Sequence, residues 1–198
     1  MARRWLALLM LTLLSTVVSA QEAVHAPAVI HLASEDWEDY TAADGHGLAW
    51  DVLRKVFEPV GVKVEIRSVP YTRSIGLVQL KEVDALVGSY RDEAGQVLYP
   101  HWNFDSDHIY ALGLASNPPP TLATLGKYRL AWVRGYRYEN YLPNVKRYNQ
   151  IERRTGILPM LKQGRADYYI DALTEIEAVM RSAPDPAQYR YSHLVELP

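Results

Sequence analysis

Two kinds of hydrophobic pattern alternate along the chain, and they predict alternating strands and helices. Short runs of apolar residues are typical of buried strands, whereas apolar residues that recur every three or four positions indicate helices. Four apolar residues fall within the five positions from Val83 to Val87. Such a run suits a strand that is covered on both faces, as in a parallel sheet. We therefore expect residues 83–87 to form the central strand of an α/β unit.

The first half of the chain fits a strand–helix–strand–helix–strand order around this run. We expect strands at 29–33 and 62–66, the second with alternating apolar and polar positions. Helices are expected at 48–59, which Gly61 ends, and after Pro70. This order predicts a doubly wound α/β lobe.

The second half of the chain predicts another α/β unit. A strand is expected at 110–115, and the proline-rich segment Asn117–Pro120 then marks the edge of the first lobe. The elements expected beyond it are strands at 129–133, 145–148, 166–170 and 189–197, and helices from about 138, at 157–163 and at 173–181. The predicted division is residues 21–116 for lobe 1 and 117–198 for lobe 2.

The first 20 residues have the pattern of a cleaved secretory signal peptide. A basic start, Met1 to Arg4, is followed by an apolar region from Trp5 to Leu14 and by small residues up to Ala20. The alternative is a membrane anchor, which the shortness of the apolar run disfavours. We predict cleavage after Ala20, so residues 1–20 are excluded from the fold.

Composition narrows the classes of protein. The 198 residues include no cysteine, so an exported form has neither disulfides nor the lipid-bearing cysteine of a lipoprotein. Removal of residues 1–20 takes away Arg3 and Arg4, which leaves 19 basic residues against 23 acidic ones and a formal charge of −4. This charge gives no support for nucleic acid or an anionic membrane as a partner.

Polar residues follow directly after the central run. Gly88 and Ser89 end the strand, and Tyr90 and Arg91 come next, where open α/β sheets usually bind ligands. The guanidinium of Arg91 can donate two parallel hydrogen bonds to a carboxylate. Ser89 and Arg91 are therefore candidate ligand-binding residues. The alternative is a solvated loop arginine that pairs with Asp92 or Glu93.

Several segments, in their order and spacing, resemble the periplasmic solute-binding proteins of polar amino-acid ABC transporters, family 3. The matching segments are Ser34–Trp37, Pro70–Arg73, Glu82–Ala85, Leu122–Lys127, Val133–Tyr136 and Leu161–Asp171. The resemblance implies an α/β, two-lobed periplasmic binding protein-like (type II) fold, with a ligand cleft between lobes that close about a hinge.

This sequence departs from the family pattern in two respects. Arg91 lies closer to the strand than the family's carboxylate-binding arginine does, so the anion site is expected to be shifted or altered. In addition, the family chain usually crosses back to the first lobe and adds helices. This sequence stops at Pro198, near that crossing. We therefore expect a C-terminally truncated form with an uncovered apolar sheet surface.

The remaining candidate residues come from both expected lobes. Trp37 and Tyr71 are candidates for apolar walls of a ligand site, as is Tyr40, although ordinary half-buried aromatics are an equal alternative. Gly135 and Tyr136 lie where free backbone N–H groups favour an anion, or else they form a simple turn. Asp171 ends a strand and could hold an ammonium group or cap the helix at 173.

The function expected from the resemblance is capture of a small polar solute, an amino acid or related zwitterion, for the membrane permease of an ABC transporter. The protein is expected in the periplasm, as a monomer without a cofactor. No nucleophile elbow, phosphate loop or histidine spacing typical of a metal site is present in the sequence. A lyase or dehydratase-like enzyme on the same fold and a ligand-sensing domain remain as alternatives.

Overall fold

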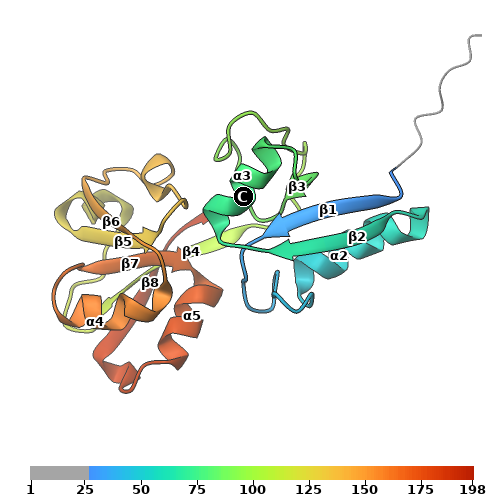
Figure 1. Ribbon diagram of the computed structural model, residues 1–198. Helices are drawn as coiled ribbons and strands as arrows, with labels where there is room; N and C mark the ends of the chain where they lie inside the picture. Colours follow the sequence, from blue (N-terminus) through green and yellow to red (C-terminus); the bar gives the residue numbers. More distant parts are fainter. Residues whose placement is uncertain (1–26) are drawn as a thin grey trace, which may run out of the picture.

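The computed structural model describes residues 27–198, which form two sheets surrounded by helices (Figure 1). The expected signal peptide at 1–20 lies outside the described residues. No helix within 27–198 combines the length and the apolar character needed to cross a membrane.

The first lobe is a three-stranded parallel sheet in the order β2-β1-β3. The elements are β1 (Val29–Ser34), α2 (Leu48–Phe57), the short helix η1 (Glu58–Val60), β2 (Lys63–Ser68), α3 (Tyr71–Gln79) and β3 (Ala85–Leu86). Successive side chains of β1 point to opposite faces of the sheet. Leu32 accordingly packs with Trp50 of α2, and Ala33 packs with Leu77 of α3.

The central strand of this sheet is β1, which corrects the expectation for residues 83–87. Those residues do lie between two helix layers, since Val83 packs with Leu77 and Val87 packs with Trp50. However, the strand has only β1 as a neighbour within the described residues. An apolar run indicates that both faces of a strand are buried, and here α2 and α3 cover the two faces. It does not report how many strands lie beside it.

The second lobe is a mixed five-stranded sheet in the order β6-β5-β7-β4-β8. Its elements are β4 (Asp107–Leu114), η2 (Leu122–Lys127), β5 (Arg129–Val133), η3 (Tyr138–Asn140), β6 (Arg147–Ile151), η4 (Arg154–Gly156), α4 (Ile157–Lys162), β7 (Tyr168–Ala172), α5 (Leu173–Arg181), η5 (Pro186–Gln188) and β8 (Tyr189–Leu197). Strands β5, β6 and β7 are parallel, whereas β4 is antiparallel to both β7 and β8.

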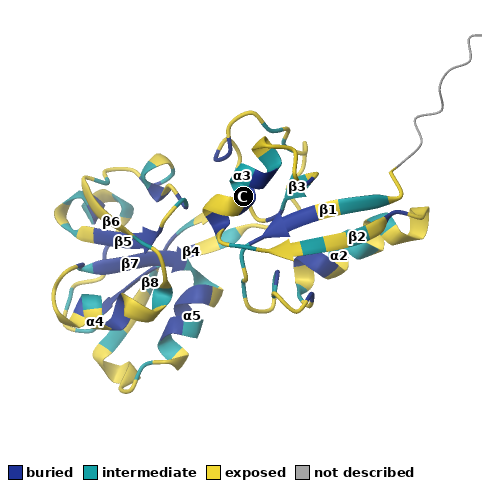
Figure 2. Ribbon diagram, viewed as in Figure 1, coloured by how far each residue is buried: buried dark blue, intermediate teal, exposed yellow. Residues whose placement is uncertain are grey.

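Helices α4 and α5 cover one face of this sheet, and the segments around η2 and η3 cover the other. Ile157, Leu161 and Ile176 of the helices pack on Tyr169 of β7. On the opposite face, Trp132 of β5 lies in the largest buried cluster, and Figure 2 shows that burial is concentrated in these central strands. This core fixes the strand ends that carry the candidate site.

The change from one sheet to the other falls between β3 and β4. Strand β4 belongs to the second sheet, although the sequence pattern assigned residues 110–115 to the first lobe. The segment 117–120 lies between β4 and η2, inside the second lobe, so its prolines mark a connection within that lobe. Among residues 27–198, strand β8 is an edge strand that pairs only with β4.

The helix expected from about residue 138 is also corrected. Only the single turn η3 forms there, and the chain then leaves helical structure before Pro143. Because the ring of a proline disfavours helical geometry in the residue before it, Leu142 cannot readily continue a helix.

Two aspartates have matching roles in the two lobes. Asp84 accepts a hydrogen bond from the backbone N–H of His31 at 2.7 Å, and Asp167 accepts one from the backbone N–H of Arg129 at 2.7 Å. Each carboxylate thus binds the start of a neighbouring strand. Both residues therefore have a structural role at the start of a strand.

Candidate ligand-binding site

A cavity of about 1190 Å³ lies against residues from both lobes. First-lobe residues Trp37 and Tyr71 line it, as do second-lobe residues Tyr136 and Asp171. The cavity continues along the loop between β3 and β4 to Phe57 of α2. It is a mostly apolar space with a few convergent polar groups, which is the usual character of a small-molecule site.

Three of the predicted aromatic residues meet in this cavity. The Trp37 ring lies 5.9 Å from that of Tyr71, and the Tyr71 ring meets that of Tyr136 edge to face at 5.4 Å. Trp37 Nε1 donates a hydrogen bond to Tyr136 Oη at 2.8 Å, which joins the two lobes. Trp37 is held closely, because a Cβ added to Gly88 would lie 2.2 Å from its ring.

A guanidinium from the second lobe lies among three carboxylates. Arg154, at the start of η4, donates from Nε to Asp171 Oδ2 at 2.9 Å and approaches Glu175 Oε2 at 3.0 Å. Its Nη1 donates to Glu35 Oε1 of the first lobe at 3.2 Å. We call Glu35, Tyr136, Arg154, Asp171 and Glu175 the Arg154 cluster.

The Arg154 cluster is well shielded from water. The side chain of Arg154 is 18% exposed, those of Glu35 and Glu175 are 17% and 10% exposed, and that of Asp171 is 1% exposed. Tyr136 Oη accepts a hydrogen bond from Arg154 Nη2 at 2.5 Å and donates one to Glu35 Oε2 at 3.3 Å. One cation is therefore shared by three partly or fully buried acids.

Burial and like charge perturb the acids of this cluster. Burial raises the pKa of Glu175 to about 7; Arg154 opposes this rise, whereas Asp171 and Glu35 add to it. Burial also raises the pKa of Glu35, against the effect of Arg154. For Arg154, burial alone would lower the pKa, but the neighbouring charges, Asp171 foremost, raise it overall. The arginine therefore stays charged, while Glu175 can be neutral near physiological pH.

A further buried acid, Glu93, lies on the first-lobe side of the cavity. Glu93 Oε2 accepts hydrogen bonds from the Tyr71 hydroxyl and, at 3.1 Å, from the backbone N–H of Tyr90. Its Oε1 has no hydrogen-bond partner among the described residues. Burial raises the pKa of Glu93 to about 7. Across the cleft, Arg137 Nη1 donates to the Glu93 backbone carbonyl at 3.2 Å.

Gly135 brings the second lobe against helix α3. A Cβ at this position would lie 2.6 Å from Thr72 Cγ2 and 3.3 Å from Tyr71 Cδ1. Its φ of +96° is a backbone conformation that side chains disfavour. The Tyr136 N–H donates to the Val133 carbonyl at 3.3 Å and so closes a turn. A simple turn was the alternative to an anion site for Gly135 and Tyr136. The glycine therefore permits close contact between the lobes.

The remaining predicted residues differ in their surroundings. Ser89 donates to the Tyr90 carbonyl at 3.1 Å and lies 3.4 Å from Glu93 Oε2. Arg91 lines the same cavity but is exposed, and its Nη2 donates to the Pro100 carbonyl at 2.8 Å. Asp171 lies within β7 and does not cap α5, whose N-cap is Ala172 without a side-chain bond.

Sequence reasoning missed Glu35, Glu93, Arg154 and Glu175. Glu35 lies inside the segment that carried the family resemblance, so its position beside Trp37 was the available signal. Glu93 was considered only as a surface partner of Arg91. Arg154 lies on a single turn between β6 and α4, and nothing in the local pattern relates it to Glu35, which is 119 positions away.

The fold matches that of known amino-acid-binding proteins. No family model and no curated protein sequence matches the chain. Among solved structures, the substrate binding protein of an amino acid ABC transporter matches with a TM-score of 0.64 and 18% identity, over 84% of this chain and 78% of that chain. Holo ArgBP from T. maritima matches with a TM-score of 0.65 and 15% identity, over 86% and 80% of the two chains.

An arginine 3rd transport system periplasmic binding protein from Legionella pneumophila gives a TM-score of 0.65 at 11% identity, over 85% of this chain and 80% of that chain. The chain thus has the fold of the substrate-binding proteins of amino-acid ABC transporters, and the predicted two-lobed fold is confirmed.

Proposed function

We propose that this protein is a periplasmic binding protein that captures an amino acid with a cationic side chain, such as arginine or lysine, for the permease of an ABC transporter. The observation that carries this proposal is the position of Arg154. Its guanidinium lies between the lobes and contacts Asp171, Glu175 and Glu35. The cleft therefore already accommodates the chemical group that distinguishes arginine from neutral amino acids.

The charge balance of the cluster favours a cationic ligand. Three carboxylates face one guanidinium, so an excess of negative charge remains even when Glu175 is protonated. In a water-poor cleft such an excess attracts cations and disfavours anions. A ligand with two positive groups, an α-ammonium and a basic side chain, complements the cluster better than a neutral or acidic amino acid does.

In the proposed complex, the ligand displaces Arg154 from the carboxylates. Asp171 accepts from the ligand's ammonium group, and Trp37, Tyr71 and Tyr136 contact its aliphatic part. Arg91 is the proposed partner of the carboxylate, because it lines the same cavity and carries a guanidinium with free donors beyond its bond to Pro100. Ser89 and the Gly135–Tyr136 turn complete the proposed surroundings.

The comparisons support the same class of ligand. Of the structures reported above, one is named ArgBP and one is named for an arginine transport system. At 15% and 11% identity these likenesses concern the fold, so the argument for a cationic ligand rests on the acids of this chain.

A thermal-shift screen of the exported protein tests the proposal. Arginine, lysine, glutamine and glutamate are added at equal concentrations, with ionic strength held constant. Ligand at a hundredfold excess over its dissociation constant stabilises the native state by about 2.7 kcal/mol. We expect arginine or lysine to raise the melting temperature and glutamate to leave it unchanged. A shift with glutamate alone, or none with any amino acid, contradicts the proposal.

An enzyme on the same fold is a second candidate, and Glu93 is the observation that favours it. A buried carboxyl with a pKa near 7, hydrogen-bonded to Tyr71 in a cavity, has the properties of a general acid or base. The ligands that bind in the screen are incubated with the protein and followed by NMR. Unchanged ligand supports the binding protein, whereas conversion that Glu93→Gln abolishes supports the enzyme.

The cellular parts of the proposal are tested separately. N-terminal sequencing of protein from the periplasmic fraction is expected to begin at Gln21, and intact Met1 there contradicts cleavage.

Light scattering is expected to give the mass of a monomer. The expected permease is tested by co-purification from membranes with and without the ligand, where ligand-dependent capture of a transporter subunit supports the proposed role.

A further inference from the structure

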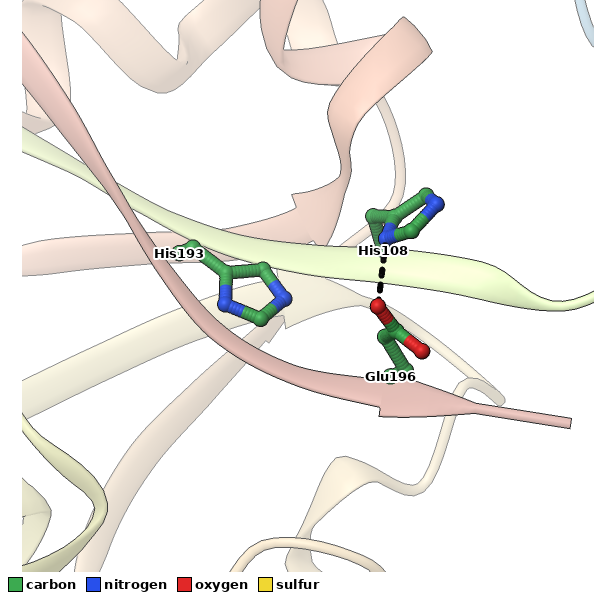
Figure 3. Close-up of side chains that lie close together, drawn as sticks. All are labelled: His108, His193 and Glu196. Atoms are coloured by element: carbon green, nitrogen blue, oxygen red, sulfur yellow. Dashed lines mark ion pairs between the residues drawn. The ribbon is translucent and has the colours of Figure 1, made fainter.

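Two histidines and a glutamate gather on the outer surface of the paired strands β4 and β8 (Figure 3). His108 comes from the start of β4, His193 from the middle of β8 and Glu196 from the end of β8. All three are exposed, and one potential ligand atom from each lies within 4.8 Å of the others. His108 Nδ1 is 3.3 Å from Glu196 Oε1, the pair that the dashed line marks in Figure 3.

A β-bulge brings the three side chains to one face. In a regular strand, residues three apart point to opposite faces, so His193 and Glu196 would be separated by the sheet. The pairing register shifts between Ile109 and Tyr110, because Ile109 lies opposite Val195 whereas Tyr110 lies opposite His193. The extra residue is Leu194, which is buried. A bulge of this kind re-aims side chains, and here it directs His193 to the side of His108 and Glu196.

The neighbouring side chains leave the site room to adjust. The ring of His193 lies 6.2 Å from that of His108 and 5.2 Å from that of Tyr110. The side chains of His108 and Glu196 are 56% and 63% exposed, so both can change rotamer at little cost. Ligand atoms around a tetrahedral ion with bonds of about 2.1 Å lie roughly 3.4 Å apart, a modest contraction from the present arrangement.

We propose that His108, His193 and Glu196 form a surface binding site for a divalent first-row transition metal ion, with Zn²⁺ as the probe of choice. Two imidazole nitrogens and one carboxylate oxygen are a donor set that suits Zn²⁺, Ni²⁺ and Cu²⁺ and disfavours Mg²⁺ and Ca²⁺, which prefer oxygen ligands. Water completes the coordination, because three protein ligands leave at least one position open.

The proposed ion would connect β8 to its partner strand β4. In the described part of the chain, strand β8 is the edge of the second sheet and pairs with β4 alone. A metal held by one residue of β4 and two of β8 adds a link between them near the end of β8. Its donor set shares no residue with the Arg154 cluster, so the proposal is independent of the proposed amino-acid ligand.

The first lobe offers a matched control. His31 of β1 and Glu65 of β2 form a similar exposed pair, with Nδ1 3.4 Å from Oε2 and side-chain exposures of 52% and 45%. Among the described residues, no second histidine joins this pair in a cluster of potential ligands. His31→Ala thus removes a surface histidine of the same kind without touching the proposed metal site.

Calorimetric titration with Zn²⁺ tests the site, using tag-free exported protein first freed of metal with EDTA. We expect one equivalent to bind to the wild type and to His31→Ala. His193→Ala and Glu196→Gln should weaken binding at least tenfold, because loss of even an outer-shell partner of a metal ligand costs 10–100-fold in affinity. Mg²⁺ at the same concentration should not compete.

A spectroscopic measurement complements the titration. Co²⁺ added to the wild type should give visible absorption bands of a low-coordinate site, and His193→Ala should lose them. Because the three side chains are exposed, the metal-free variants should have the melting temperature of the wild type. A variant with a lower melting temperature is replaced by His108→Gln. Equal Zn²⁺ affinity of wild type and His193→Ala, or equal losses in His193→Ala and His31→Ala, would overturn the proposal.

Discussion

Arg154 Nη1, in the second lobe, lies 3.2 Å from Glu35 Oε1 in the first lobe. Together with the hydrogen bond from Trp37 to Tyr136, this ion pair joins the two lobes across the cleft. The structure therefore shows the lobes in contact around one of the protein's own guanidinium groups. The proposed ligand would therefore compete with Arg154 for these carboxylates.

Removal of Arg154 should destabilise the ligand-free protein. Arg154→Ala leaves Asp171 and Glu175 close together and buried without their cation. Loss of one partner of a buried ion pair typically costs about 3–5 kcal/mol. Urea unfolding at pH 8 measures this loss. Arg153→Ala is the matched control, since it removes an adjacent but exposed arginine and should change the free energy of unfolding by less than about 0.5 kcal/mol.

The buried acids should make the protein more stable at mildly acidic pH. The pKa of Glu93 is raised to about 7 in the folded state, so between about pH 4.5 and 7 the native state binds more protons than the unfolded state. The free energy of unfolding should therefore fall as pH rises through this window. Each pKa unit corresponds to about 1.4 kcal/mol, which gives roughly 3 kcal/mol for this group.

Urea unfolding at pH 5 and at pH 8 measures this linkage. Glu93→Gln should reduce the difference in unfolding free energy between the two pH values, and the remainder should come largely from Glu175. Glu65→Gln is the control, because the pKa of Glu65 is lowered by Lys63 and cannot produce a loss of stability at higher pH. An unchanged pH dependence in Glu93→Gln would contradict the environment described for this side chain.

A methyl group at residue 135 should hold the lobes apart. In Gly135→Ala the new Cβ would lie 2.6 Å from Thr72 Cγ2, across the contact between the second lobe and α3. Gly61→Ala has a comparable backbone strain, with φ of +82°, but its Cβ would have no neighbour within 4 Å. Small-angle scattering should show a larger radius of gyration for Gly135→Ala only. Equal radii in the two variants would mean that residue 135 does not limit lobe closure.

The proposed role of Arg91 can be tested with a pair of ligands. Agmatine is arginine without its carboxylate, so it lacks the group that Arg91 is proposed to hold. Arg91→Ala should weaken arginine binding about 30-fold or more, which is about 2 kcal/mol, and leave agmatine binding nearly unchanged. Arg91→Lys should recover little, because an ammonium group cannot reproduce the planar fork. Equal losses for the two ligands would assign the carboxylate to another group.

The sequence pattern was sufficient for the elements with strong periodicity. Helices α3, α4 and α5 lie where apolar spacing placed them, as do strands β1, β5 and β8. The apolar pattern failed to predict which strands pair with each other, because it depends on burial and not on strand neighbours. It could not show that β4 joins the second sheet, because an apolar strand fits either sheet equally well. It also could not show that β1 is the central strand of its sheet. A strand with both faces buried has the same apolar pattern at the centre of a sheet and at its edge.

Some residues of the candidate cavity were already candidates in the sequence. Trp37 and Tyr71 were expected as aromatic walls and Tyr136 as a residue at a strand end, and the structure places their rings together. Arg154 was not predictable, because its contacts depend on the path of the chain between β6 and α4. The histidine cluster was missed for the same reason. His108 and His193 are far apart in the sequence, and only the antiparallel pairing of β4 with β8 and its bulge bring them together.

The competition between Arg154 and the ligand is tested most directly by titration calorimetry of arginine into wild type, Arg154→Ala and Arg153→Ala. If Arg154 occupies the position of the ligand's cationic group, its removal should tighten arginine binding at least tenfold, which is about 1.4 kcal/mol. Arg153→Ala should bind as the wild type does. Weaker binding by Arg154→Ala would contradict the account, because Arg154 would then hold the ligand rather than compete with it.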